Sequence, residues 1–403
     1  MKTKTWEINK LEEVCEILDN KRVPISSKNR IRGIYPYYGA SGIVDYIDKY
    51  IFDEELVLIG EDGAKWGAFE NSAFIAEGKY WVNNHAHILK PNNEILINKF
   101  LVYFLNYSNL EKYITGATVK KLNQQKLKQI EIPLPPLEEQ MRIVKILDLA
   151  FEKIDTSVEL LKANLANLDE LAQSVLDRTF NPLGDSADST ESTQNPSTHD
   201  TQSPYPLPQH WEWKTLGEIG DIITGSTPSK NNPKFYGNDY PLFKPSDLGS
   251  GNTIKASDNL SKLGFESARK LPKNTLLVVC IGASIGKIGL SGIIGSCNQQ
   301  INAIIPSPNV LSKYLFFVCH SKYFQSILKK NASQTTLPII NKTEFSKLEI
   351  PLPKDIKEQE QIAKHLDFVF EKTKALKELY TKELKDYEEL KQSLLNKAFK
   401  GEL

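Results

Sequence analysis

One stretch of the sequence occurs twice and decides the fold. It reads IEIPLP at residues 130–135 and LEIPLP at residues 348–353, and each copy leads into a long charged segment that ends at Phe180 or Phe399. Beyond the prolines the copies align without a gap at a shift of 219 residues, so that Glu139-Gln140 matches Glu358-Gln359. A repeat of this length indicates that a structural unit has been duplicated.

Each copy predicts a long helix that pairs with another helix. Both charged segments run for about 40 residues without Pro or Gly, which break helices. Apolar or small residues recur at alternating steps of four and three, as in a coiled coil. Both copies interrupt this pattern at the same place, with Asn164 and Glu383, which favours pairing of the two helices with each other. The predicted seam residues are Ile143, Leu147, Ala150, Ile154, Ser157, Leu161, Leu168, Leu171 and Val175 in the first copy, and Ile362, Leu366, Val369, Thr373, Leu376, Tyr380, Tyr387, Leu390 and Leu394 in the second.

The segment after the first helix favours an antiparallel pair. Residues 181–204 are rich in Ser, Thr and Asp and nearly free of bulky apolar residues, which predicts a flexible linker. Such a linker spans roughly 25–30 Å, whereas a helix of about 40 residues is about 60 Å long. Parallel helices would pull the linker nearly taut, so antiparallel helices cost less loop entropy.

The globular parts repeat as well. Trp6-Glu7 recurs as Trp211-Glu212, the turn at 63–67 recurs at 282–286, and Asn123 recurs as Asn341. We therefore expect an α+β chain in which two mixed α/β globular domains are separated by two long antiparallel helices that form a coiled coil, with a pseudo-twofold internal repeat. The expected parts are a first globular domain at 1–136, a central helix at 137–180, the linker at 181–204, a second globular domain at 205–354 and a C-terminal helix at 355–403. Inside the globular domains we expect a buried strand at 56–59, a helix at 98–115, and two buried strands around a glycine turn between 275 and 295.

Charge is distributed unevenly along the chain. The 403 residues include 50 Lys or Arg and 50 Asp or Glu, but residues 206–350 carry 16 basic against 9 acidic side chains, and residues 137–180 are net acidic. A basic module beside acidic ones favours a partner with negative charge. The four cysteines form no CxxC pair and the N-terminus has no apolar signal-peptide core, so we expect reduced, buried thiols in a cytoplasmic protein.

We find no motif that predicts catalysis or a metal site. The run Gly282–Lys287 resembles a phosphate-binding loop, but its glycines are too close together and Ile288 stands where the motif requires Ser or Thr. His85 and His87 could place two imidazoles on one strand face, but no third and fourth ligand is evident, so ordinary strand histidines are the expectation. No catalytic residue, metal or cofactor is therefore assigned to this chain.

Side chains suited to DNA recognition are better represented. Base edges are read by Arg, Lys, Asn, Gln and small hydroxyls on loops, while other basic groups contact phosphates. Any one such residue is more often a solvated surface group, and it is their clustering on two duplicated modules that is informative. The candidates are Lys28, Arg30, Arg32, Tyr37, Tyr38, Lys65, Trp66, Lys120, Lys121 and Asn123 in the first module, and Thr227, Ser229, Lys230, Lys244, Ser246, Lys287, Gln334 and Thr335 in the second.

At these residues the chain resembles a known family, the specificity subunit (HsdS) of type I restriction-modification systems. The stretches that carry the resemblance are PYYGASGIVDYID (36–48), LIGEDGA (58–64), TGSTPSKNNPKFYG (224–237), IPLPPLEEQMRIVKILD (132–148), IPLPKDIKEQEQIAKHLD (350–367) and LKQSLLNKAFKGEL (390–403). They cover the whole chain in the right order. One departure is the linker at 181–204, which is longer and richer in Ser and Thr than a tight connection requires.

The resemblance implies a non-catalytic subunit that reads double-stranded DNA. Each globular domain would be a target-recognition domain for one half of a bipartite, asymmetric site, and the helices would set the spacing. Two methyltransferase subunits that bind S-adenosylmethionine would dock on the helices, and motor/nuclease subunits that use ATP and Mg would join the full complex. Docking is expected on helix faces that carry Glu139, Gln140, Arg142, Glu358, Gln359 and Gln361.

Two other classes of function stay open from the sequence. A coiled-coil scaffold with two protein-binding heads and no DNA role accounts for the helices but not for the basic second module. A nuclease fused to a reader requires a carboxylate cluster for a metal, and none is convincing. Binding of DNA separates the first alternative, and a magnesium-dependent activity of the isolated chain would separate the second.

Overall fold

The computed structural model describes residues 6–116, 118–181, 205–249, 251–333 and 337–403. The chain divides into two compact units, which are described separately. Unit 1 comprises Met1–Ala163 and Tyr380–Leu403, and unit 2 comprises Asn164–Leu379. Each unit therefore contains one globular part together with a portion of both long helices. The predicted linker lies outside the described residues except for Asn181.

The two long helices predicted by the repeat are present and have equal lengths. Helix α4 runs from Leu137 to Phe180 and helix α10 from Ile356 to Phe399, each with 44 residues. Each helix follows a Pro-containing strand, β10 (Glu131–Leu134) or β20 (Glu349–Pro353). The proline before each helix explains its sharp start, because proline lacks the N–H that a continuing helix would need.

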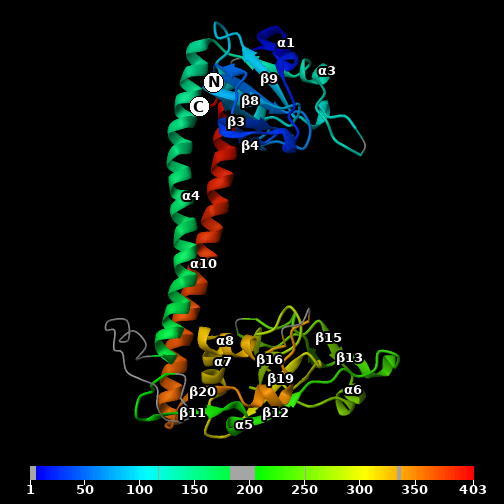
Figure 1. Ribbon diagram of the computed structural model, residues 1–403, viewed down its shortest axis with the longest axis vertical. Coiled ribbons are helices and arrows are strands. Elements are labelled where there is room, and N and C mark those ends of the chain that lie inside the picture. The colour runs from blue at the N-terminus through cyan, green and yellow to red at the C-terminus, as the bar shows by residue number, and fades with distance from the viewer. Residues whose placement is uncertain (1–5, 117, 182–204, 250, 334–336) are drawn as a thin grey trace. The chain divides into compact units, whose positions relative to one another are not determined.

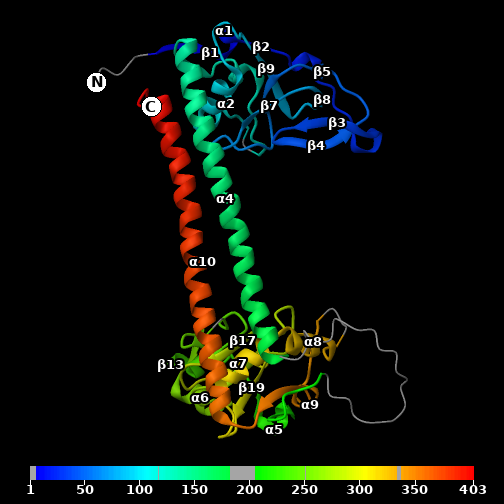
Figure 2. The same ribbon diagram turned by 90° about the vertical axis from the view of Figure 1, so that its left-hand side faces the viewer.

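Within each unit the two helices lie side by side and antiparallel (Figures 1 and 2). In unit 1, Arg142 Nη2 donates to the Leu403 carbonyl at 2.8 Å, and Lys391 forms an ion pair with Asp155. Later residues of α4 therefore contact earlier residues near the end of the chain, as in an antiparallel pair. In unit 2, Lys377 forms an ion pair with Asp169, and the apolar cluster that includes Leu176 also includes Leu366. The antiparallel pairing expected from the linker is confirmed.

The predicted seam is correct in the first part of α4 and wrong in parts of both helices. Ile143, Leu147, Ile154 and Leu161 are buried. Leu171, Leu376 and Leu390 are instead 52 %, 39 % and 44 % exposed. In unit 2 the buried face of α4 passes through Ala172 and Leu176, each one residue later than the predicted Leu171 and Val175, and ends at Phe180. The shift arises because the helix end packs on the globular core as well as on α10.

The globular part of unit 1 holds two four-stranded sheets and one strand pair. The first sheet has the order β2-β9-β6-β7 and is antiparallel throughout, the second has the order β4-β3-β8-β5, and β1 pairs with β10. Its strands are β1 (Glu7–Lys10), β2 (Cys15–Ile17), β3 (Arg32–Gly39), β4 (Gly42–Ile47), β5 (Phe52–Asp53), β6 (Leu56–Gly60), β7 (Ala73–Ala76), β8 (Lys79–Val82), β9 (Ala86–Pro91) and β10, and its short helices are α1 (Leu11–Val14), α2 (Asn98–Tyr107) and α3 (Gln124–Leu127). The buried strand expected at 56–59 is β6, but the helix expected at 98–115 ends at Tyr107.

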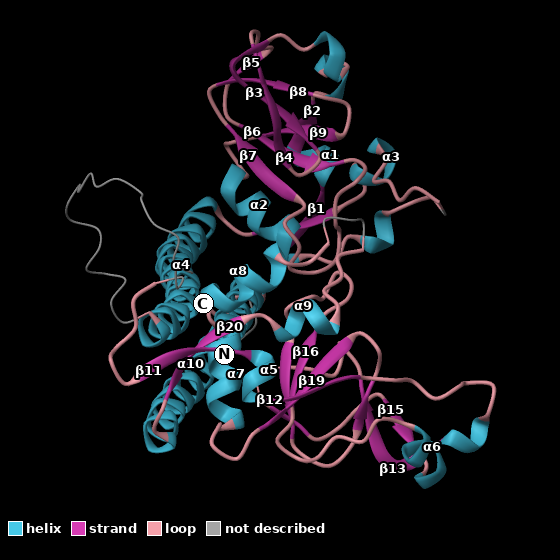
Figure 3. Ribbon diagram, turned by 60° about the horizontal axis from the view of Figure 1, so that its bottom comes forward, coloured by secondary structure: helices cyan, strands magenta, loops and turns pink. Residues whose placement is uncertain are grey.

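Unit 2 has the same plan with a wider sheet. The main sheet has the order β12-β19-β16-β17-β14, a second sheet has the order β15-β13-β18, and β11 pairs with β20. The strands are β11 (Trp211–Thr215), β12 (Gly220–Thr224), β13 (Tyr236–Phe243), β14 (Asn252–Thr253), β15 (Asp258–Leu260), β16 (Leu276–Val279), β17 (Ile288–Ser291), β18 (Ser296–Cys297), β19 (Ile301–Pro306) and β20, and the short helices are α5 (Leu216–Ile219), α6 (Lys262–Ser267), α7 (Ser312–His320), α8 (Lys322–Lys330) and α9 (Lys342–Ser346). The two strands expected between 275 and 295 are β16 and β17, which pair antiparallel. Helix α7 lies beside the main sheet (Figure 3), and its apolar residues share a core with β16 and β19.

The end of a long helix completes the core of each unit. In unit 1 the ring of Phe399 lies 5.4, 5.4 and 5.0 Å from the rings of Phe100, Phe104 and Tyr107 on α2. In unit 2 the fully buried Phe180 meets the ring of Tyr314 on α7 edge-on at 5.5 Å. Phe180 and Phe399 are equivalent in the repeat, so each unit is closed by the same helix position. None of the described helices is both long and apolar enough to cross a membrane.

Candidate nucleic-acid interface

A glycine turn and a hairpin lie next to each other in unit 1. The turn at 62–67 follows β6, and its Gly63 adopts a φ of 68°, which residues with a Cβ rarely take. The hairpin is closed by two backbone bonds between Thr115 and Lys121, of 2.9 and 2.8 Å. Gly116 at its base has a φ of 95°, and a Cβ there would lie 2.1 Å from the Val119 carbonyl oxygen, so only glycine fits. A bridge between Asp62 and Lys121 joins the turn to the hairpin.

The turn and the hairpin enclose an open cleft of about 720 Å³. Lys65 of the turn and Lys120 of the hairpin both line it, together with backbone of Gly63 and Gly116. The Lys65 ammonium lies 3.8 Å from Glu70 and its side chain is 80 % exposed, so this pair is weak. Lys120 makes no ion pair or hydrogen bond with the described residues. The fold thus brings together two lysines that are 55 positions apart in sequence, with their charge turned to solvent.

Unit 2 contains the same pair of elements. The turn at 282–286 connects β16 and β17, with Gly282 at a φ of 94° and Gly286 at 89°. The Gly282 N–H donates to the Pro338 carbonyl at 2.9 Å, and the Ser333 N–H donates to the Ile339 carbonyl at 2.9 Å, which matches the hairpin closed by Thr115. Lys287 follows this turn, is exposed, and has no side-chain partner in the described part of the chain. Gln334 and Thr335, predicted to contact DNA, lie outside the described residues.

Several side chains predicted to contact DNA in unit 1 are structural instead. Tyr37 is 1 % exposed and its hydroxyl accepts a 2.9 Å bond from the Ile25 N–H, so this prediction is wrong. Trp66 is 5 % exposed and its indole N–H donates to the Gly60 carbonyl at 3.0 Å, so that prediction is also wrong. The sequence predicted both aromatic rings on loop surfaces. Instead, the pleat of β3 directs Tyr37 into the core, and the turn at 62–67 directs Trp66 into it.

Other predicted residues of unit 1 are held by internal bonds. Arg30 covers the ring of Tyr37 at 4.4 Å and pairs with Asp45 at 3.1 Å, and the half-buried Tyr38 packs between Phe74 and Tyr80. Asn123 caps helix α3, accepting from the Lys126 N–H at 2.9 Å. Lys121 pairs with Glu61 at 2.8 Å. Lys28 and Arg32 are exposed without a bonded partner among the described residues, and with Lys65 and Lys120 they remain the candidates for phosphate contacts.

The predicted residues of unit 2 divide in the same way. Lys244 is half-buried, with its ammonium 2.5 Å from Asp258 and its N–H bonded to Asp247 at 2.8 Å, so its charge is already matched. Thr227 donates to Gln299 at 2.8 Å, and the Ser229 hydroxyl accepts from the Asn231 N–H at 3.3 Å. Lys230, Ser246 and Lys287 are exposed. Arg269, which the sequence did not single out, anchors this loop through the carbonyl of Thr224 and the hydroxyl of Ser226.

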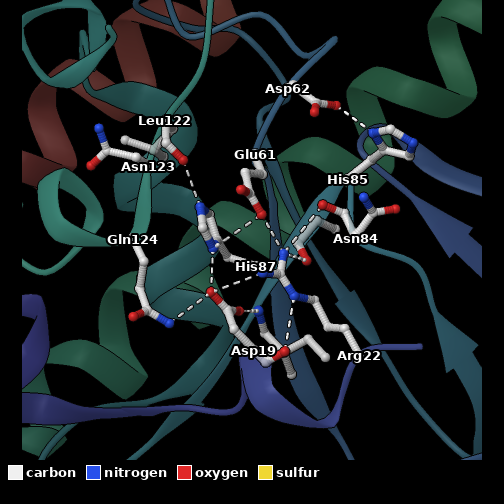
Figure 4. Close-up of polar contacts among 12 residues, drawn as sticks. Asp19, Arg22, Glu61, Asp62, Asn84, His85, His87, Leu122, Asn123 and Gln124 are labelled. Carbon is white, nitrogen blue, oxygen red and sulfur yellow. Dashed lines mark hydrogen bonds and ion pairs between the residues drawn. The ribbon is translucent and has the colours of Figure 1, made fainter. Parts of the chain in front are cut away.

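A buried polar cluster under the hairpin of unit 1 was missed by the sequence analysis (Figure 4). His87 on β9 is fully buried between Asp19 and the Leu122 carbonyl, each 2.6 Å from a ring nitrogen. Arg22 joins Asp19 at 3.4 Å and also pairs with Glu61, which in turn pairs with Lys121. The only sequence signal was a histidine at an inward position of an apolar strand. His85, two residues earlier, faces outward and bonds to Asp62 at 2.6 Å.

The surroundings of Asp19 and Glu61 in this cluster favour the ionised form of both carboxylates. Burial alone would raise the pKa of Asp19, but the hydrogen bond and charge of His87, and the charge of Arg22, outweigh burial and hold that pKa below its ordinary value. Burial likewise opposes ionisation of Glu61, and its bonds with Lys121 and Arg22 lower its pKa nevertheless. The described residues contain no group of three or more His, Cys, Asp or Glu side chains placed to hold a metal ion.

Two residues predicted to dock a partner are buried and bond to their own globular part instead. Gln140 is 0 % exposed, where its amide accepts from the Ile97 N–H at 3.0 Å and donates to the Ile95 and Pro135 carbonyls at 2.8 Å. Gln359, its repeat equivalent, is 1 % exposed and makes the corresponding bonds to Leu311, Asn309 and Pro353. Both predictions are wrong, because these glutamines fasten a long helix to its own globular part.

Most of the other residues predicted to dock a partner already form bonds within the chain. Glu139 and Arg142 bond to each other through two contacts of 2.8 Å, and Glu358 accepts from His210 and from the Trp211 indole at 2.9 Å. Gln361 is exposed. Each helix also presents large apolar residues to solvent at repeat-equivalent positions: Leu149 and Leu160 in unit 1 are 52 % and 63 % exposed, and Phe368 and Leu379 in unit 2 are 59 % and 56 % exposed.

The sequence matches one family model over most of its length. That model describes the type I restriction modification DNA specificity domain, and it matches residues 3–167 and again residues 208–386. The chain belongs to this family. The two matches coincide with the two halves of the repeat, so the chain carries two specificity domains.

Relatives of these specificity domains agree with the assignment. The chain is 45 % identical over 139 residues to the putative type I restriction enzyme specificity subunit S.HindORF215P of Haemophilus influenzae, a match that covers 34 % of this chain and 35 % of the relative. It is 24 % identical over 415 residues to the type I restriction enzyme EcoDI specificity subunit of Escherichia coli, covering 99 % of this chain and 88 % of the relative. The chain thus spans about a third of the first relative and most of the second.

The fold is shared with a solved structure. A chain from a structure that concerns complex assembly and conformational transition of the type I R-M system superposes with a TM-score of 0.71 at 21 % identity, over 99 % of both chains. At that identity the likeness establishes the fold alone. The α+β architecture expected from the sequence is therefore confirmed.

Proposed function

We propose that this chain is the DNA-reading subunit of a type I restriction-modification complex and has no catalysis of its own. Each specificity domain reads one half of a bipartite, asymmetric duplex site in the cytoplasm. The observation that carries this proposal is the glycine turn and hairpin found in both units, because they place solvent-facing lysines on matching surfaces whose other side chains differ. Phosphate contacts fix the position of a protein on the duplex, whereas base contacts determine which sequence it binds. Two domains with the same backbone elements but different surface side chains therefore suit two different half-sites.

In this proposal Lys65 and Lys120 contact phosphates near the cleft of the first domain. A lysine that neutralises one phosphate on binding releases counterions, so each lost contact reduces the slope of log affinity against log salt by about 0.9. We expect Lys65→Ala and Lys120→Ala to weaken binding of a duplex and to reduce that slope. Lys153→Ala, an exposed lysine on α4, is the control that leaves the slope unchanged.

The proposal is tested with the full chain co-expressed with its methyltransferase partner. Mapping adenine methylation in the DNA of those cells identifies the site, and gel shifts with a duplex of that sequence at several salt concentrations give the slopes. A split, asymmetric site with slopes reduced by the two lysine variants supports the proposal. A chain that assembles with the methyltransferase but retains no duplex would favour the protein-binding scaffold instead.

We also propose that S-adenosylmethionine, ATP and Mg act only in partner subunits, and that two methyltransferase subunits dock on outward apolar residues of the long helices. Leu149 and Leu160 lie eleven residues apart, about three helical turns, and so share one face of α4. Phe368 and Leu379 repeat this spacing on α10. Exposed apolar residues at matched positions suit two copies of one partner.

Charge substitutions on these faces test the docking. We expect Leu160→Asp or Leu379→Asp to leave one methyltransferase subunit bound instead of two, and the double variant to retain none, because a carboxylate cannot be desolvated against an apolar partner surface. Both residues are exposed, so the variants should fold. The measurement is the mass of the complex by light scattering. Two retained methyltransferase subunits in the double variant would contradict this docking site.

A further inference from the structure

His87 in unit 1 is held by a short hydrogen bond at each nitrogen of its ring. Its Nδ1 faces the Asp19 carboxylate and its Nε2 faces the Leu122 carbonyl, both at 2.6 Å. A carbonyl oxygen can only accept, so Nε2 carries a proton and donates to Leu122. The bond between Nδ1 and the Asp19 carboxylate is the kind of charge-assisted contact that is short and about twice as strong as a neutral one. The charged groups around the ring are Asp19 and Arg22 from the segment after β2, Glu61 from the end of β6, and Lys121 beyond it.

The bonds of this cluster converge on the base of the hairpin. Leu122 directly follows the hairpin, and its carbonyl accepts from His87 while its N–H donates to the Glu61 carbonyl at 2.8 Å. The Lys121 ammonium pairs with the Glu61 carboxylate at 2.8 Å. Asp19 accepts from the Gln124 amide at 3.0 Å, two residues further along. Residues 121–124 are therefore tied to the sheet through one connected set of polar side chains, and Figure 4 shows the part of that set at Leu122 and Gln124.

Unit 2 has the same hairpin without this set. The register of β2 and β9, in which Ile17 faces Leu89, continues to bring Asp19 opposite His87, and in β12 and β19 the corresponding pair is Thr224 and Asn302. Thr224 donates to Asn302 at 2.7 Å. Ile340, the counterpart of Leu122, keeps the backbone bond to Cys280 at 3.0 Å, but among the described residues no side chain bonds to its carbonyl. The strand pairing alone thus does not require a charged pair.

We propose that His87 is a positioning residue that sets the hairpin at 115–121, and with it Lys120, against the glycine turn so that the first specificity domain grips DNA. This rests on the proposed function, because it deepens how the same surface is held. His87 does not touch the DNA itself. It acts through the Leu122 carbonyl, and Asp19 acts by orienting His87.

The test replaces the charged pair of unit 1 with the neutral residues, Thr and Asn, that unit 2 has at the corresponding positions. In the full chain, Asp19→Thr with His87→Asn keeps a strand pairing that the second unit already tolerates but leaves the Leu122 carbonyl without a donor. Without DNA, we expect the amides of Lys121 and Leu122 to exchange hydrogen at least about tenfold faster, while Ile340 and the strand β6 exchange as before. Affinity for the duplex that carries the mapped site should fall, with the strand exchange as the check that the core is intact.

A measurement on the unaltered protein covers the case in which the variant does not fold. In protein labelled with ¹⁵N-histidine, the Nε2 of His87 should give the shift of a protonated, hydrogen-bonded nitrogen, because it faces the Leu122 carbonyl. An Nε2 without a proton, or unchanged exchange of Lys121 and Leu122 in a folded variant, would overturn the proposal. Faster exchange in a chain whose unaltered form binds no duplex would leave the positioning role standing and overturn the proposed function.

Discussion

Replacing Phe399 with alanine should loosen unit 1 and leave unit 2 as it is. Phe399 belongs to the last turn of the second repeat, yet its ring packs on Phe100, Phe104 and Tyr107 of the first globular part at 5.0–5.4 Å between ring centres. A fully buried Phe→Ala change costs about 3–5 kcal/mol. Phe399 is only partly buried, so we expect about 2–3 kcal/mol.

The lost free energy should appear as faster local opening of α2. About 2–3 kcal/mol corresponds to a roughly 30- to 150-fold change in an equilibrium constant, which should appear as faster amide exchange in α2 without a comparable change in α7. Hydrogen exchange with mass spectrometry measures both helices in one sample. A single melting temperature would not serve, because a chain with two units does not unfold in one step.

The matched control is Phe180→Ala, the equivalent residue in the other repeat. Its ring is fully buried against Tyr314, so we expect a larger loss, about 3–5 kcal/mol, that opens α7 and spares α2. Equal loosening of both helices in both variants would refute the idea that each unit is closed by one helix end. So would protection that is unchanged in α2 when Phe399 is removed.

Three further predictions follow from single contacts. Gln140→Ala should destabilise unit 1 by about 1–3 kcal/mol because it strands a buried N–H and two carbonyls, and Gln359→Ala should do the same in unit 2; exchange at the start of α4 or α10 measures each. Because the folded-state pKa values of Asp19 and Glu61 lie below their ordinary 3.8 and 4.5, their stabilisation of unit 1 is complete above those values and is lost as the pH falls through the folded-state values. Asp19→Asn should flatten that acid dependence in a pH series of exchange rates, and a dependence of unchanged steepness would contradict it. Gly116→Ala should disorder the hairpin and lower duplex affinity without loosening β6, since its Cβ would meet the Val119 carbonyl.

The repeat and its periodicity were sufficient to predict the two long helices and their antiparallel pairing. A segment of 44 residues without Pro or Gly, entered through a proline, forms a helix whose ends local sequence can locate, and α4 and α10 end at the phenylalanines where the repeat ends. The antiparallel pairing also followed from sequence, through the length of the linker. Sequence named Lys65 and Lys120 among the candidates for DNA contact in the first module, and the tertiary structure brought them to one cleft.

Which side chains face inward was decided by tertiary structure. Gln140 and Gln359 have the polarity of surface residues, yet both are buried because backbone groups of a distant loop need partners. Tyr37 and Trp66 looked like loop aromatics, but each fills a core that other strands build. The seam of α4 changed its phase near Phe180 for the same reason, since a helix that contacts two surfaces cannot keep one heptad stripe. Periodicity is a property of neighbours in the chain, whereas burial depends on residues more than a hundred positions away, as Asp19 and Gln124 are under the hairpin.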